Sequence, residues 1–218
     1  MKQLIIFDLD GTLLNTIGDL AACCNQTLEK HQLPTHSDEE YASFVGNGIM
    51  RLVERTIPEP LRTVERVAEI RKDFVALYTE NIAIHSTPYA GIVELLRTLS
   101  EQGVAVAIAS NKFQAGCEKL AKHYFPNIRF ATVLGQRPNI ALKPDPYIIR
   151  EIIQRTSYTP DKILFVGDSG VDMQTASAAG VDSVGVTWGF RSREELEKAG
   201  AKHIIDTANQ LLEIIHNS

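Results

Sequence analysis

Strand-like and helix-like segments alternate along most of this chain, and this alternation restricts the fold more than any other feature of the sequence. Short runs rich in Val, Ile and Leu are each followed by an amphipathic or Ala-rich segment. We expect strands near residues 4–7, 104–110, 130–134, 163–168, 181–187 and 203–205. Strands that alternate with helices indicate a parallel sheet covered by helices on both faces. The sequence therefore predicts an α/β fold.

One long segment interrupts the alternation. Between Asn15 and Asn81 no run is typical of a strand, and apolar residues recur at helical intervals. Within it, Ser37 and Glu40 have the spacing of a capping box, which marks the start of a helix. We expect helices at residues 17–33, just after residue 37, at 49–57 and from 60 onward. The chain is therefore expected to consist of a core domain, residues 1–14 and 86–218, and an inserted all-helical domain, residues 15–85.

The first expected strand ends in two carboxylates. Asp8 and Asp10 follow the apolar run Leu4–Phe7, and side chains two residues apart on a strand project to the same side. Asp10 also precedes Gly11, and Asp-Gly is a strong hairpin signal. Taken alone, these residues fit a hairpin with a solvated Asp8 and a chemical site equally well.

Polar side chains at the ends of the other expected strands favour the site. In parallel α/β sheets the ligand crevice lies beyond the carboxyl ends of the strands. The polar residues that follow the strands, together with a lysine that precedes a helix, are Asp8, Asp10, Ser110, Asn111, Lys143 and Asp168. Asp172 follows Asp168 by four residues, which places both on one face if the segment is helical. Separate helix caps and surface charges do not explain why these groups appear at successive strand ends.

The chemistry of this set favours a magnesium ion and a phosphate group. Clustered carboxylates repel unless a cation neutralises them, and an all-oxygen ligand set suits Mg²⁺. The Lys143 ammonium and the Ser110 hydroxyl suit phosphate oxygens, as do backbone N–H groups near Ser110 that open onto a helix N-terminus. A carboxylate can also attack phosphorus and form an aspartyl-phosphate. Asp8 is therefore the candidate nucleophile, and Asp10 is the candidate acid and base beside it.

Composition argues against several other classes of protein. The chain has 218 residues, with 27 acidic against 22 basic side chains and no basic block, so we do not expect a nucleic-acid partner. No apolar run is long enough to span a bilayer, and the N-terminus lacks the layout of a signal peptide. Three cysteines without metal-type spacing fit a reducing compartment. We therefore expect a cytoplasmic protein with no membrane partner.

Four short motifs resemble those of a known family. The segments FDLDGTL, SNK, LKPDP and VGDSGVDMQTASAAG, in this order and spacing, resemble the four motifs of haloacid dehalogenase superfamily phosphatases. The resemblance covers the whole core, and the helical insertion stands where that family places its cap domain. It implies a Rossmann-like core with an all-helical cap. FVGNG in the insertion and VTWGFRS near the end further resemble phosphoglycolate phosphatases.

The resemblance implies roles for the four acidic residues. Asp8 would be the nucleophile and a Mg²⁺ ligand. Asp10 would be the acid and base, and would also give its backbone carbonyl to the metal. Asp168 would bind Mg²⁺, and Asp172 would orient a water on the metal.

It also implies how the phosphoryl group is held, through Ser110, Asn111 and Lys143. One departure from the family pattern is Asn15, where relatives usually carry aspartate before the first helix of the cap. That position is not catalytic, so the departure concerns only the hinge or its local charge.

Three functions fit this pattern. The leading hypothesis is a Mg²⁺-dependent phosphatase acting on a small phosphate monoester such as 2-phosphoglycolate. A phosphosugar mutase of the same superfamily would use Asp10 equally well. A non-enzymatic phosphate- or protein-binding module is the third, and the intact set of polar residues argues against it.

Substrate selection needs groups outside this set, because every monoester presents the same phosphate. Asn47 and Arg51 in the helical insertion are the candidates. Arg51 would pair with a substrate carboxylate, which would favour phosphoglycolate over a sugar phosphate.

Overall fold

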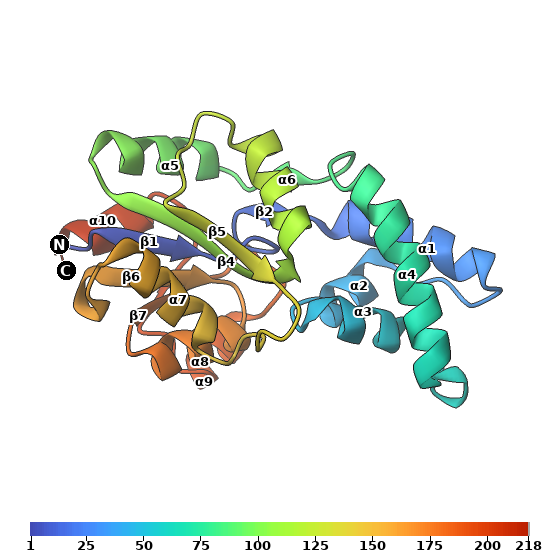
Figure 1. The fold of residues 1–218 in the computed structure, drawn as a ribbon. Coiled ribbons are helices and arrows are strands. Elements are labelled where there is room, and N and C mark those ends of the chain that lie inside the picture. The colour runs from blue at the N-terminus through green and yellow to red at the C-terminus, as the bar shows by residue number, and fades with distance from the viewer. Residues whose placement is uncertain (218) are drawn as a thin grey trace. The chain divides into compact units, whose positions relative to one another are not determined.

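The computed structural model describes residues 1–217, and the chain divides into two compact units. The core unit comprises Met1–Asn15 and Pro88–Ser218, and the helical unit comprises Thr16–Thr87. Two short strands, β2 (Leu14–Asn15) and β3 (Thr87–Pro88), pair with each other where the chain passes between the units. Most elements of both units are labelled in Figure 1.

The core unit is built on a six-stranded parallel sheet (Figure 1). Its strand order is β5-β4-β1-β6-β7-β8, so the first strand of the chain lies in the middle. The strands are β1 (Leu4–Phe7), β4 (Ala105–Phe113), β5 (Thr132–Gln136), β6 (Ile163–Gly167), β7 (Asp182–Val186) and β8 (His203–Ile205). The prediction of an α/β fold with a Rossmann-like parallel sheet is confirmed.

Helices cover both faces of this sheet. Figure 1 shows α5 (Ile92–Glu101) and α6 (Gln114–Tyr124) on one side of it, and α7 (Tyr147–Thr156) and α8 (Gly170–Ala179) on the other. Two shorter helices, α9 (Arg193–Lys198) and α10 (Gln210–Asn217), follow β7 and β8 in the chain. Because both faces are covered, β1 is buried at every position and its sequence shows no polar alternation.

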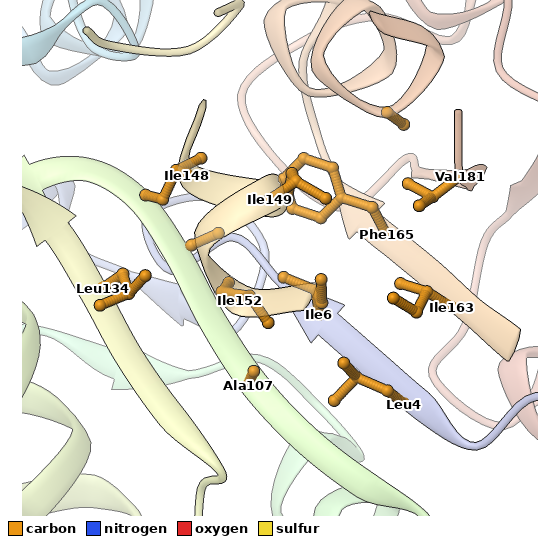
Figure 2. Packing of buried hydrophobic residues seen from close by; sticks show 12 residues of the cluster. Leu4, Ile6, Ala107, Leu134, Ile148, Ile149, Ile152, Ile163, Phe165 and Val181 are labelled. Carbon is orange, nitrogen blue, oxygen red and sulfur yellow. The ribbon is translucent and has the colours of Figure 1, made fainter. Parts of the chain in front are cut away.

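Isoleucines of α7 hold the central strands in place. In the register of the sheet, Ile6 of β1 lies opposite Ala107 of β4 and Phe165 of β6. The buried cluster that these strands form with α7 includes Leu4, Ile6, Ala107, Leu134, Ile148, Ile149, Ile152, Ile163, Phe165 and Val181 (Figure 2). Leu4 and Ile6 face this cluster because they are two residues apart on a strand. The packing thereby fixes the strand that ends next to Asp8.

Two elements near the site differ from expectation. Strand β4 continues to Phe113, because its pairing with β5 resumes there after an irregularity that follows Ala109, so Ser110 and Asn111 belong to the strand. Helix α8 begins at Gly170, so Asp168 lies in the loop before it. The expectation that Asp168 and Asp172 share one face of a helix is therefore wrong.

The helical unit is formed by α1 (Ile17–Lys30), α2 (Asp38–Phe44), α3 (Gly48–Thr56) and α4 (Val64–Asn81). The capping box at the start of α2 is confirmed: the Glu40 N–H donates to Ser37 Oγ at 3.3 Å, and the Ser37 N–H donates to Glu40 Oε2 at 2.8 Å. Helix α4 starts later than expected, because the 3-10 turn Glu59–Leu61 precedes it and the Thr63 hydroxyl caps it by accepting the Arg66 N–H.

One buried carboxylate joins the two ends of the helical unit. Asp19, in the first turn of α1, is almost fully buried. Its oxygens accept the backbone N–H groups of Ile84 at 3.2 Å, His85 at 2.8 Å and Ser86 at 2.8 Å. The Ser86 hydroxyl donates to it as well, at 2.5 Å. This carboxylate therefore binds the segment after α4 to the start of α1.

Among the described residues, no helix has both the length and the apolar character that crossing a membrane requires.

Candidate active site

Asp8 lies immediately beyond the central strand β1, and its surroundings exclude the hairpin interpretation. The Asp8 N–H donates to the Val166 carbonyl at 2.9 Å, which extends the pairing with β6 by one residue. Both neighbours of β1 run parallel to it, so β1 does not enter a hairpin. The Asp8 carboxylate is buried and accepts the Leu9 N–H at 2.7 Å.

Gly11 brings the loop after β1 close to the end of β6. Its φ of +83° lies in the left-handed region, which glycine adopts without steric cost. A Cβ atom at this position would collide with the carboxyl group of Asp168. The Asp-Gly pair therefore serves the close approach of two loops that both carry acidic residues.

Lys143 joins two of the predicted site residues. Its Nζ lies 3.0 Å from Asp8 Oδ1 and 2.6 Å from Asp172 Oδ1, and it donates to the Ala109 carbonyl at 3.0 Å. The side chain is only 1% exposed. Burial by itself lowers the pKa of the Lys143 ammonium, but the carboxylates of Asp172 and Asp8 outweigh that effect and raise the pKa. Lys143 therefore stays charged between these two acids.

Asn111 fixes the backbone of Lys143. Its Oδ1 accepts the Lys143 N–H at 2.8 Å, and its Nδ2 donates to the Lys143 carbonyl at 3.0 Å. Both polar ends of the Asn111 amide are thus engaged with one residue. The side chain therefore fixes Lys143, and the contact with phosphate that the sequence predicts stays a prediction.

Asp10 contacts a second buried lysine, Lys112, which the sequence pattern did not single out. Lys112 Nζ donates to Asp10 Oδ1 at 3.0 Å and to Oδ2 at 3.3 Å, and its side chain is only 3% exposed. The Lys112 N–H donates to the hydroxyl of Ser110, which is also buried, at 3.3 Å. The available signal was the spacing of Ser110 and Lys112, because residues two apart on a strand share a side.

Asp168 is held from two directions. Its Oδ1 accepts the Thr12 hydroxyl at 3.2 Å, and its Oδ2 accepts the Phe190 N–H at 2.8 Å. A Cβ atom at Gly189 would collide with Asp168, so the segment that includes Phe190 passes directly over it. Trp188 anchors the same segment by donating its indole N–H to the Thr12 carbonyl at 3.1 Å.

Asp172 reaches the site through a helix cap. It stands at the third position of α8, and its Oδ2 accepts the Ser169 N–H at 3.1 Å and the Ser169 hydroxyl at 2.6 Å. A Cβ atom at Gly167 would collide with Asp172, which shows how closely the end of β6 approaches it. Asp172 thus lies beside Asp168 because the chain turns between β6 and α8.

The arrangement of these acids suits a divalent cation. Carboxylate oxygens of Asp8, Asp168 and Asp172 all lie within 4.8 Å of one another. Burial, opposed by Lys143, raises the pKa of Asp8, and burial together with the charge of Asp172 raises that of Asp168. A bound cation would relieve both the desolvation and the repulsion, and an all-oxygen set of this kind suits Mg²⁺. The residues present therefore fit the ion that the sequence predicts.

The two residues expected to select the substrate lie in the helical unit. Asn47 precedes α3, and its Oδ1 accepts a hydrogen bond from Arg55 Nη2 at 2.8 Å. Arg51, on α3, pairs with Glu54 at 2.5 Å, and its side chain is 64% exposed. Arg51 therefore keeps a solvent-exposed guanidinium, whereas the Asn47 carbonyl is engaged within its own unit.

Comparison with known proteins finds similar sequences over almost the whole chain. A family model for haloacid dehalogenase-like hydrolases matches residues 5–186. A phosphoglycolate phosphatase of Mannheimia succiniciproducens is 32% identical over 219 residues, which cover 98% of each protein. One from Pectobacterium atrosepticum is 33% identical over 218 residues, which cover 98% of this chain and 92% of the relative.

A solved structure shares the whole fold. It is that of a protein assigned as a phosphoglycolate phosphatase, from Lactobacillus delbrueckii subsp. bulgaricus. The two chains superpose with a TM-score of 0.91 at 32% identity, over 99% of each. The predicted resemblance to phosphatases of this superfamily, and more narrowly to phosphoglycolate phosphatases, is confirmed. By its fold, its sequence and its matches, the chain belongs to the haloacid dehalogenase-like hydrolase family.

Proposed function

We propose that this protein is a Mg²⁺-dependent phosphatase that hydrolyses a small phosphate monoester through an aspartyl-phosphate on Asp8, with 2-phosphoglycolate as its substrate. The observation that carries the proposal is the buried Asp8 carboxylate at the end of the central strand. It contacts Lys143 and lies beside Asp168 and Asp172. The relatives named phosphoglycolate phosphatase support the choice of substrate.

In the first half of the reaction, an Asp8 oxygen attacks the phosphorus atom. The bond between phosphorus and the ester oxygen of the substrate breaks, and the Asp10 carboxyl group gives its proton to that oxygen. The products of this step are the free alcohol, an aspartyl-phosphate and the Asp10 carboxylate. Asp8 suits the nucleophilic role because its side chain is held by the Leu9 N–H and by Lys143.

In the second half, the Asp10 carboxylate takes a proton from water as the water oxygen attacks phosphorus. The bond between phosphorus and the Asp8 oxygen breaks. Inorganic phosphate and the Asp8 carboxylate are formed, and Asp10 again carries the proton it needs for the next cycle.

The surrounding residues hold the phosphoryl group and the metal. Lys143, 3.0 Å from Asp8 Oδ1, is close enough to contact a phosphoryl group carried by Asp8, and the Ser110 hydroxyl is the second candidate donor. Asp8, Asp168 and the backbone carbonyl of Asp10 would hold Mg²⁺, with Asp172 next to it. When bound, the ion neutralises charge on the acids and on the phosphate.

We assign chemistry to the core unit and substrate selection to the helical unit, as its cap. Every phosphate-directed group named above belongs to the core unit. The exposed Arg51 guanidinium of the helical unit is suited to pair with the carboxylate of phosphoglycolate, and Asn47 is the second candidate for a substrate contact.

The proposal is tested by measuring phosphate release from phosphoglycolate, sugar phosphates, a nucleotide and pyrophosphate, with Mg²⁺ and with excess chelator. We expect phosphoglycolate to give the highest kcat/KM, chelation to stop turnover and Mg²⁺ to restore it. Ca²⁺ should substitute poorly, because its coordination is larger and less regular. Full activity in excess chelator would contradict the metal assignment.

The other two hypotheses give different results in the same assay. A mutase would isomerise a sugar phosphate without releasing stoichiometric phosphate. A binding module would turn over none of these compounds.

A further inference from the structure

The two acids at the end of β1 are each paired with a separate lysine. Lys143 contacts Asp8 at 3.0 Å, and Lys112 contacts both oxygens of Asp10, at 3.0 and 3.3 Å. We propose that Lys112 is a positioning residue that holds the Asp10 carboxyl group in the orientation needed for proton transfer. This inference rests on the proposed function, in which Asp10 is the acid and base.

The contact restricts the Asp10 side chain in a specific way. A carboxylate bonded through one oxygen still rotates about its last torsion, whereas a donor placed between both oxygens fixes the plane of the group. Lys112 Nζ is such a donor. The acid must point at the ester oxygen in the first half-reaction and at water in the second, so a fixed plane serves both steps.

Lys112 is itself fixed by the packing around β4. Its backbone N–H donates to Ser110 Oγ, and the thiol of the buried Cys117 lies 3.5 Å from its carbonyl oxygen. A Cβ atom at Gly135 would collide with the same carbonyl, so β5 lies directly against it. The ammonium therefore extends toward Asp10 from a backbone that these contacts hold in place.

A purely structural role explains this lysine poorly. Burying an ion pair costs desolvation of both charges, and apolar residues of similar volume often give equal or greater stability. Lys112 is buried, and its ammonium contacts the proposed acid and base, which lies 102 residues away in sequence. A role in the reaction accounts for both facts.

If Lys112 positions Asp10, the loss of rate on removing Lys112 should depend on the leaving group of the substrate. An alkyl phosphate such as phosphoglycolate needs a proton on its leaving oxygen, whereas p-nitrophenyl phosphate releases a stable anion without one. Loss of the acid, or of its orientation, should therefore slow the first half-reaction for the alkyl ester much more than for the aryl ester. General misfolding or loss of metal would slow both alike.

The experiment compares Asp10→Asn, Lys112→Met and the double variant with the unaltered enzyme. Lys122→Met, which removes an exposed lysine of α6, is the matched control. Single-turnover release of the alcohol and of p-nitrophenol measures the first half-reaction for each substrate. Circular dichroism checks the fold, and Lys112→Gln, which keeps a polar group at the end of the side chain, is measured in parallel.

We expect Asp10→Asn to slow alcohol release by ~10²–10⁴-fold and Lys112→Met by about 10- to 100-fold. Both variants should lose much less rate with p-nitrophenyl phosphate. Because Lys112 acts through Asp10, the double variant should be no slower than Asp10→Asn alone. Lys122→Met should behave as the unaltered enzyme.

Two other results of these assays would contradict the positioning role of Lys112. A third would contradict the acid role of Asp10, on which it rests. Equal losses on both substrates in Lys112→Met and Lys112→Gln would indicate a structural role. If the double variant loses as much activation free energy as the two single variants together, Lys112 acts independently of Asp10, for example on the phosphoryl group. If Asp10→Asn itself shows no dependence on the leaving group, the proposed acid role of Asp10 fails instead.

Discussion

The core unit and the helical unit each bury a carboxylate, and they satisfy it in different ways. Asp8 in the core unit receives one backbone N–H and the ammonium of Lys143. Asp19 in the helical unit receives three backbone N–H groups and one hydroxyl, all from the segment Ile84–Ser86. A side chain such as that of Lys143 can rotate toward a bound substrate. Backbone N–H groups leave the carboxylate only if their whole segment moves. The first arrangement suits chemistry, and the second suits structure.

Replacing the buried aspartate by asparagine should therefore abolish activity in the core unit and lower stability in the helical unit. Asp8→Asn should reduce turnover to background, because an amide cannot form the acyl-phosphate. The fold should remain intact, since the amide oxygen still accepts the Leu9 N–H and a buried charge is removed. Phosphate release and thermal unfolding measure the two effects. An active Asp8→Asn enzyme, with deamidation excluded by mass spectrometry, would contradict the assignment.

Arg51→Ala tests whether the helical unit selects the substrate. We expect kcat/KM for phosphoglycolate to fall about 10- to 100-fold, as for a lost charged hydrogen bond worth about 1.5–3 kcal/mol. A small aryl phosphate without a carboxylate should be spared. Glu54→Ala, which removes the partner of Arg51 on α3, is the matched control for helix stability. Equal losses on both substrates would assign Arg51 to the folding or closure of the helical unit.

Asp19→Asn should destabilise the helical unit and leave the chemistry in place. The amide keeps one acceptor oxygen but turns an N–H₂ group toward backbone donors, which should cost about 1–3 kcal/mol of unfolding free energy. Hydrogen exchange at Ile84, His85 and Ser86 should accelerate, because their N–H groups lose their acceptor. Retained protection there would show that Asp19 is not what holds this segment. Turnover should change less than tenfold (on the order of 1 kcal/mol).

The smallest expected effect concerns stability without metal. Burial raises the pKa of Asp8 and Asp168, so the folded protein keeps protons that the unfolded chain releases once the pH passes about 4. The stability of the metal-free protein should therefore fall as the pH rises from that value, until both groups have titrated in the folded protein as well. Mg²⁺ should restore a few °C of Tm (roughly 1 kcal/mol) at neutral pH and less in acid. Scans of Tm against pH with and without chelator measure this, and a slope unaffected by Asp8→Asn would contradict it.

Local sequence patterns predicted most of the fold because each pattern is completed within a short segment. The run Leu4–Phe7 and the capping box of α2 show this. Boundaries were less predictable where a neighbour decides them. Strand β4 extends to Phe113 because β5 pairs with it again there, and α4 starts at Val64 because a 3-10 turn precedes it.

The site was predictable where residues stand at strand ends, as Asp8 and Asp168 do. It was not predictable where a contact depends on two distant segments. The pair of Lys112 with Asp10 spans 102 residues, and the hydrogen bonds of Asp19 span 65 to 67. Asp172 was singled out for a helix face that it does not share with Asp168. It does lie beside Asp8 and Asp168, because the chain turns between β6 and α8.

The segment over Asp168 also carries a naturally fluorescent side chain. Trp188 is the only tryptophan in the chain, and its indole N–H donates to the Thr12 carbonyl in the loop that carries Asp10. Indole emission responds to the polarity and charge around the ring. Excitation at a wavelength that tryptophan absorbs and tyrosine does not therefore excites only the Trp188 indole, which lies beside the acidic cluster. We expect the binding of an ion or of phosphate at that cluster to change this fluorescence, which would allow binding to be measured without a label and without turnover.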